Sequence, residues 1–233
     1  MIPQKKRLLG LTPTELKAVV GSLGMPAFTA RQMVQWLYEK HVRSIDEMTN
    51  ISKVNREKLA EHFEVGALEP LDCQRSKDGT IKYLFPMLTA NSQQPIANSQ
   101  LFVETVFIPD HGRATLCVSC QVGCKMNCLF CQTGKQGWQG DLTPADILNQ
   151  IYALPEVDRL TNIVFMGQGE PMDNLDAVLK VCEIMTAHWG GNFLMNSSGS
   201  LAPGTWSTRT FMSSFSRMPM ARCAAFFPAA SLS

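Results

Sequence analysis

The sequence lacks any apolar run of about 18 residues or more, the length that a membrane-spanning helix requires. Its N-terminus is basic but has no apolar core of the kind found in secretory signals. The net charge is only +1 at pH 7, so the overall charge neither favours nor excludes a nucleic-acid partner. From these absences we expect a cytoplasmic protein that does not bind membranes.

A second pair of cysteines, which structural zinc sites usually need, is also missing. The chain has 8 cysteines, and five of them fall in the stretch CVSCQVGCKMNCLFC, residues 117–131. Cys73 and Cys182 stand alone, far from this stretch. In a cytoplasmic protein, such a cluster is more typical of metal binding or of chemistry than of disulfides.

Within the cluster, Cys124, Cys128 and Cys131 follow the spacing C-x3-C-x2-C. Thiolates are soft ligands, and three of them suit three irons of a [4Fe–4S] cluster. The fourth iron then remains open to a small chelating ligand. The spacing therefore predicts an iron–sulfur site, with a zinc-stabilised, non-catalytic RNA-binding module as the alternative.

The chain length of 233 residues accommodates one medium domain and one small one. Apolar spacing in residues 1–65 predicts a small helical accessory domain, with helices over 11–24 and 53–63 and another that is capped by Thr29. The first of these helices begins with the capping box TPTE. Exposed Lys and Arg side chains of this domain either contact RNA phosphates or form a solvated face.

Residues 66–112 are predicted to form a β-rich connection, with strands at TIKYLF and LFVETVFIP and a polar loop at 91–100. From 113 to 189 strands and helices alternate, which indicates a parallel sheet with right-handed crossovers. Loops at the C-terminal ends of such strands carry the chemistry. The cysteine loop and the segment GQGEP, residues 167–171, both follow strands, so we expect them on the same side.

The cysteine spacing, the aromatic Phe130 before the last cysteine and the GxGEP segment resemble the radical S-adenosylmethionine (radical-SAM) superfamily. The stretches ATLCVSCQVGCKMNCLFCQTGKQGW, FVETVFIPD and NIVFMGQGEPMDN are similar to the RlmN/Cfr group of radical-SAM RNA methyltransferases. This resemblance runs from about residue 5 to 189. It implies an α/β fold in which residues 113–189 form the N-terminal half of a partial (β/α) radical-SAM barrel behind a helical accessory domain.

The resemblance also implies an activity, cofactors and partners. Members of the group methylate C2 of adenosine in 23S ribosomal RNA and tRNA, whereas the Cfr type methylates C8. The three cysteines would hold a [4Fe–4S] cluster, and S-adenosylmethionine would bind against Gly169 and Glu170. We expect a monomer that receives electrons from a donor such as flavodoxin.

C2 of adenine is an electron-poor carbon and no nucleophile, so the group carries the methyl group to the base on a cysteine near its C-terminus. Glu104 matches the group's proton acceptor. Cys117 matches the cysteine that frees the product by attacking the crosslinking sulfur, which implies a disulfide. Cys120 stands where the group has serine, and we expect it to be a packing residue.

Residues 190–233 contain no Asp, Glu or Lys and show neither helical nor strand periodicity. The resemblance ends before them, and the surroundings of Cys223 do not match those of the methyl-carrying cysteine. We therefore expect an aberrant tail on a truncated or frameshifted product. We also expect an open half-barrel with an unpaired parallel edge, and no methylation by this chain alone.

Overall fold

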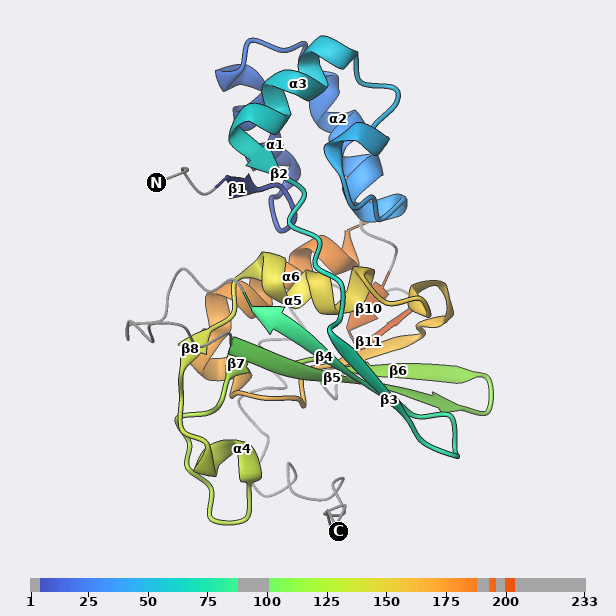
Figure 1. The fold of residues 1–233 in the computed structure, drawn as a ribbon, viewed down its shortest axis with the longest axis vertical. Coiled ribbons are helices and arrows are strands. Elements are labelled where there is room, and N and C mark those ends of the chain that lie inside the picture. The colour runs from blue at the N-terminus through green and yellow to red at the C-terminus, as the bar shows by residue number, and fades with distance from the viewer. Residues whose placement is uncertain (1–4, 88–100, 188–192, 196–199, 204–233) are drawn as a thin grey trace.

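The computed structural model describes residues 5–87, 101–187, 193–195 and 200–203. Most of the expected tail, Cys223 and the expected loop at 91–100 lie outside these ranges. The helical N-terminal part lies on one side of the helices α5 (Pro144–Tyr152) and α6 (Leu175–Thr186), and a mixed sheet lies on their other side (Figure 1). No helix in the described ranges is both long and apolar enough to cross a membrane.

Three α-helices build the N-terminal part, as the apolar spacing predicts. The first begins at a capping box in which Thr12 and Glu15 each accept a hydrogen bond from the other's backbone N–H. The expected cap at Thr29 is wrong: Phe28 is the N-cap, because the Thr29 amide already bonds to the Pro26 carbonyl at 2.9 Å and the chain turns earlier. The elements are β1 (Lys6–Arg7), α1 (Pro13–Ser22), α2 (Thr29–Val34), the π-helical turn η1 (Gln35–Glu39), the 3₁₀ turn η2 (Ile45–Glu47), α3 (Lys53–His62) and β2 (Phe63–Glu64), with β1 and β2 paired in parallel.

Seven strands form one sheet in the order β10-β11-β9-β6-β5-β4-β3. β6 and β9 are parallel, with Leu116 opposite Ile163, and the other neighbouring pairs of this sheet are antiparallel. The predicted parallel arrangement therefore holds for one pair, since the strands of the β-rich connection join the same sheet in antiparallel order. The strands are β3 (Asp72–Arg75), β4 (Ile81–Met87), β5 (Leu101–Asp110), β6 (Arg113–Cys117), β9 (Asn162–Val164), β10 (Phe193–Met195) and β11 (Ser200–Pro203).

The expected unpaired edge at β9 is also wrong. β11 runs antiparallel beside β9, with Ser200 opposite Val164 and Leu201 opposite Ile163, and β10 pairs with β11 in turn. A paired strand satisfies the backbone N–H and C=O groups that an open edge would expose. This part of the expected tail therefore extends the sheet.

Helices α5 (Pro144–Tyr152) and α6 (Leu175–Thr186) cover one face of the sheet (Figure 1). α5 begins at a capping box formed by Thr143 and Asp146. Along β5 the buried residues alternate with half-buried ones. The buried Thr105 bonds to Gln150 of α5, so its side chain faces the helices. Because successive side chains of a strand point to opposite faces, Glu104 faces the side opposite the helices. The remaining elements are β7 (Gln121–Val122), α4 (Gln132–Lys135), β8 (Gly140–Asp141), η3 (Val157–Arg159) and η4 (Pro171–Asn174).

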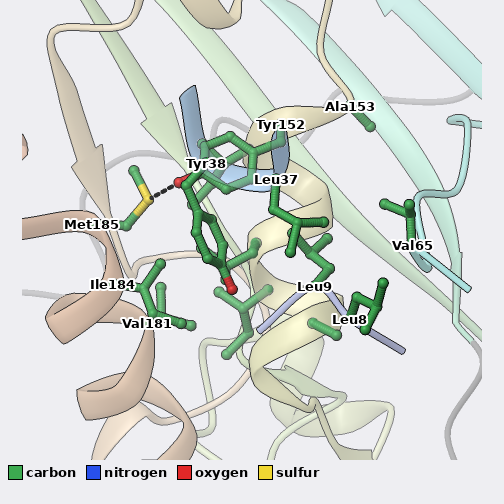
Figure 2. Close-up of a cluster of buried hydrophobic side chains, with 14 of the residues drawn as sticks. Leu8, Leu9, Leu37, Tyr38, Val65, Tyr152, Ala153, Val181, Ile184 and Met185 are labelled. Carbon is green, nitrogen blue, oxygen red and sulfur yellow. Dashed lines mark hydrogen bonds between the residues drawn. The ribbon is translucent and has the colours of Figure 1, made fainter. Parts of the chain in front are cut away.

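An apolar core joins the N-terminal part to α5 and α6. Figure 2 shows Leu9 and Tyr38 packed with Tyr152 of α5 and with Val181 and Met185 of α6, and all five are buried. The Tyr152 hydroxyl donates a hydrogen bond to the Met185 sulfur at 3.0 Å. The N-terminal helices therefore share their core with the helices that support the sheet.

Two ion pairs flank this core. Arg7 pairs with Asp146, whose side chain is fully buried, and Lys180 pairs with Glu15 at 2.7 Å. Burial tends to raise the pKa of Glu15, but the hydrogen bonds from Lys180 and Thr12 outweigh it and lower that pKa. The junction is therefore fixed by apolar packing and by charge together.

Candidate functional site

The cysteine loop follows β6 and is closed at its base by the pairing of β7 with β8. Cys124 and Cys131 are half-buried, Cys128 is exposed, and the Cys131 amide bonds to the Cys128 carbonyl at 3.0 Å. Burial raises the pKa of Cys124, and the nearby Cys131, Glu170 and Cys128 raise it further. The structure therefore places the three expected thiols on one loop, with Glu170 near Cys124.

The three thiols do not form a finished metal cage. Within the described ranges, no group of three or more His, Cys, Asp or Glu side chains lies close enough to hold a metal ion. The donor set still fits an iron–sulfur cluster, because soft thiolates stand on one loop and one of them faces solvent. The loop therefore presents three thiols whose chemistry suits such a cluster.

The GQGEP segment lies directly against the chain between β6 and the cysteine loop. The Gly167 amide bonds to the Val118 carbonyl at 3.0 Å, and the Cys120 amide bonds to the Gln168 carbonyl at 2.9 Å. The Gln168 amide in turn bonds to the Ser119 hydroxyl at 2.9 Å. The two motifs therefore lie on the same side, as their positions after strands predict.

The glycines of GQGEP permit this close approach. A Cβ on Gly167 would lie 2.6 Å from the Ser119 Oγ atom. Gly169 has a φ of +99°, and a Cβ there would lie 2.6 Å from the Cβ of Gln121. Both positions need glycine for packing, whether or not a ligand is present.

Gln121 is a buried residue that the sequence analysis missed. Its Oε1 accepts a hydrogen bond from the Glu170 amide at 2.9 Å, and its Nε2 donates to Asp141 at 2.7 Å and to Asp173 at 2.9 Å. Hydrogen bonds from Gln121 and then Lys125 lower the pKa of Asp173. Gln121 thus fixes Glu170 beside the cysteine loop. The sequence signal that could have pointed to Gln121 is its position directly after Cys120, the second cysteine of the cluster.

Glu104 and Cys117 share the face of the sheet that is opposite α5 and α6. Cys117 pairs with Val106, which lies two residues along β5 from Glu104, so both side chains point the same way. Such diagonal neighbours lie roughly 7–8 Å apart. Glu104 forms an ion pair with Lys82 at 2.8 Å. Register therefore brings the expected proton acceptor and the expected resolving thiol together.

Cys117 and Cys120 are the two buried thiols at this end of the sheet. Burial raises the pKa of Cys117 to about 11, so its thiol is protonated at neutral pH. Burial also raises the pKa of Cys120, whose thiol donates a weak hydrogen bond to the Gln168 carbonyl at 3.7 Å. The seven cysteines of the described ranges are all free, so the structure does not support the expected disulfide.

Large apolar side chains surround the loop at this end of the sheet. Leu129 is 91% exposed and Phe130 is 65% exposed, while Met166 and Met172 flank GQGEP and are each 51% exposed. Exposed apolar side chains thus stand on the cysteine loop and on both sides of GQGEP.

Two family models match the chain. The ribosomal RNA large subunit methyltransferase N-terminal domain matches residues 6–65, and the radical SAM superfamily matches residues 118–207. The second match extends beyond residue 189, where the recognised resemblance ends. The two models thus cover the N-terminal helices and the region of the cysteine loop.

Similar proteins carry matching descriptions. A probable dual-specificity RNA methyltransferase RlmN from Phocaeicola vulgatus is 56% identical over 186 residues, which are 80% of this chain and 50% of that protein. The dual-specificity RNA methyltransferase RlmN of Halorhodospira halophila is 42% identical over 187 residues, 78% of this chain and 49% of that one. The chain therefore spans about half the length of these relatives.

A solved structure agrees with the sequence comparisons. The crystal structure of a radical SAM methyltransferase from Sphaerobacter thermophilus matches with a TM-score of 0.72 and 34% identity. The match covers 82% of this chain and 55% of that chain. The mixed α/β fold, with its N-terminal helices and partial radical-SAM domain, is therefore shared with that protein.

Proposed function

Since this chain belongs to the RlmN family of radical-SAM RNA methyltransferases over the residues it shares with these relatives, we propose that it carries the cluster-binding half of such an enzyme. The proposed reaction methylates C2 of adenosine in 23S ribosomal RNA and tRNA. The observation that carries the proposal is the contact of GQGEP with the segment leading into the cysteine loop, through the backbone hydrogen bonds of Gly167 and Cys120.

In this proposal, Cys124, Cys128 and Cys131 hold a [4Fe–4S] cluster, and Gly169 and Glu170 contact S-adenosylmethionine beside it. When bound, such a cluster supplies an electron that cleaves the sulfonium of S-adenosylmethionine. The chain's own contribution is to hold three thiols and GQGEP at one end of the sheet. The exposed apolar side chains around the loop would exclude water from the bound ligand.

Glu104 and Cys117 serve the RNA in this proposal. Glu104 accepts the proton that adenine loses from C2, and Cys117 frees the methylated product from its sulfur link to the protein. Their common face of the sheet supports these roles. The raised pKa of Cys117 requires that a base remove its proton before the thiol attacks.

The proposed partners follow from the same assignment. Ribosomal RNA and tRNA are the substrates, and basic side chains of the N-terminal helices contact their phosphates. An electron donor such as flavodoxin reduces the cluster, and the protein acts as a monomer in the cytoplasm. The core shared with α5 and α6 would hold the RNA-contacting helices at a fixed position relative to the site.

Metal analysis of anaerobically reconstituted protein tests the proposal. We expect iron, inorganic sulfide and a brown visible absorbance that Cys124→Ala, Cys128→Ala or Cys131→Ala each abolishes. Cys120→Ala and Cys117→Ala are the matched controls and should retain the absorbance. Colourless protein containing zinc would favour the non-catalytic RNA-binding module, and loss of absorbance in the controls would overturn the ligand assignment.

A further inference from the structure

Gln150 of α5 is a fully buried amide whose polar groups all have partners. Its Oε1 accepts hydrogen bonds from the Ser119 amide at 2.9 Å and from the Thr105 hydroxyl at 2.7 Å. Its Nε2 donates to the Ser119 carbonyl at 3.0 Å and to the Asp146 carbonyl of its own helix at 3.3 Å. One side chain thus holds both backbone groups of Ser119 and ties them to β5.

Ser119 continues this network into the site. Its hydroxyl donates to the Glu104 carbonyl at 2.7 Å and accepts from the Gln168 amide at 2.9 Å. Ser119 also lies two residues beyond Cys117. The Gln150–Ser119 network therefore reaches β5 at Glu104, the chain just after Cys117, and the GQGEP segment.

We propose that Gln150 is a positioning residue: acting through Ser119, it sets the relative placement of Glu104, Cys117 and GQGEP. The roles of those three come from the proposed function, on which this inference rests. A planar amide that bonds both backbone groups of one residue allows little displacement or rotation. In a buried network of this kind, loss of one member leaves several donors and acceptors without partners.

The neighbouring residue on α5 provides a comparison. Asn149 is 1% exposed and also holds both backbone groups of one residue, accepting from the Leu68 amide at 2.8 Å and donating to the Leu68 carbonyl at 3.0 Å. Leu68 lies in the segment between the N-terminal helices and β3, not at the site. Asn149 and Gln150 therefore match in chemistry and burial but differ in what they hold.

The test compares Gln150→Leu with Asn149→Leu in the reconstituted 233-residue chain. The first readout is the dissociation constant of S-adenosylmethionine, from its effect on the EPR spectrum of the reduced cluster. The second is the alkylation rate of Cys117 in the metal-free chain, measured by mass spectrometry relative to Cys182, which is buried on α6 away from the network. Unfolding midpoints are recorded for both variants.

We expect Gln150→Leu to weaken S-adenosylmethionine binding and to accelerate Cys117 alkylation, each about tenfold, a factor that corresponds to about 1.4 kcal/mol and lies within the range of one lost net hydrogen bond. Asn149→Leu should lower the unfolding midpoint by about as much as Gln150→Leu does. It should leave the dissociation constant and the alkylation rate within about twofold of their wild-type values. Equal effects of the two variants, or no effect of Gln150→Leu, would overturn the inference.

Two other outcomes are covered: a Gln150→Leu variant that does not fold, and a wild-type chain that assembles no cluster. If Gln150→Leu does not fold, Ser119→Ala takes its place. This variant removes only the hydroxyl that joins Glu104 and Gln168. Weakened S-adenosylmethionine binding by Ser119→Ala then supports the inference, and unchanged binding overturns it. If the wild-type chain assembles no cluster, the proposed function fails. The Cys117 alkylation rate, which needs no cluster, then decides the inference separately.

Discussion

Gly169 shows how a single atom constrains the site. Its positive φ strains any other residue, and an added Cβ would also meet Gln121. We expect Gly169→Ala to lower the free energy of unfolding by roughly 2–4 kcal/mol, combining backbone strain with overpacking. Gly112→Ala is the matched control, because Gly112 has a φ of +78° with nothing within 4 Å of the added atom.

Urea unfolding of both variants separates the two effects. Gly112→Ala should cost roughly 1–2 kcal/mol, the backbone term alone. A cost for Gly169→Ala no larger than for Gly112→Ala would show that Gln121 moves aside, contrary to the packing described above.

Residue spacing predicts some residues of the candidate site and not others. Cys124, Cys128 and Cys131 follow a short local pattern, and so does GQGEP, so the sequence identifies them. Gln150 and Gln121 act through hydrogen bonds to segments far away in the chain, which no periodicity encodes. Their contacts become visible only in the fold, which places their partners beside them.

Helix starts and strand pairing show the same contrast among the elements. The capping box at Thr12 is a local signal, and it was predicted correctly. Thr29 has the same residue type but lies inside a turn that begins at Pro26, so the local rule failed. The pairing of β11 with β9 depends on backbone groups far apart in the chain, and no local pattern indicates it.

The ion pair between β1 and α5 should contribute strongly to stability. The Asp146 side chain is fully buried and that of Arg7 is 14% exposed, so Arg7→Leu leaves a buried carboxylate without its counter-charge. We expect a loss of about 3 kcal/mol in the free energy of unfolding. Lys53→Leu, which breaks an exposed pair with Glu57, should change little. Urea unfolding checks both, and equal effects would contradict a junction fixed by charge.

His41 should make the same junction sensitive to acid. It stacks on Tyr152 with ring centroids 4.3 Å apart, and burial lowers its pKa below the ordinary value of about 6.5, although Asp158 opposes the shift. The unfolded chain therefore takes up a proton near pH 6.5 that the folded chain does not bind. Stability conferred by neutral His41 is present above that pH and is lost as the pH falls to the folded pKa.

Unfolding free energies at pH 7.5 and pH 5.5 measure this effect. The wild type should lose more stability between the two values than His41→Phe, which keeps an aromatic ring against Tyr152 but cannot titrate. The same loss in both proteins would assign the acid sensitivity to other groups.

For the whole molecule, the two-part organisation was predictable but the union of the parts was not. Composition and spacing separate the N-terminal helices from the strand–helix region. The shared core of Tyr38 and Tyr152 joins residues more than a hundred positions apart and carries no local signal. Only the fold shows that the helices expected to contact RNA share a core with the helix that carries Gln150.

We expect the 233-residue chain to leave adenosine unmethylated. The resemblance to the RlmN/Cfr group implies a methyl-bearing cysteine held over the base, and the residues around Cys223 do not match the surroundings of that cysteine. Small misplacements near a reacting centre already cost large factors in rate. Mass spectrometry of RNA incubated with the reduced protein checks this, and methyladenosine above a no-enzyme control would make Cys223 the first candidate for the methyl carrier.

We propose that the cysteine loop and GQGEP form one site for a cluster and S-adenosylmethionine. The most direct test is the EPR spectrum of the reduced, reconstituted chain with and without S-adenosylmethionine. We expect the compound to shift the cluster signal in the wild type, and we expect Gly169→Ala to weaken this response while Gly112→Ala does not. A spectrum that stays unchanged at saturating S-adenosylmethionine would contradict the claim.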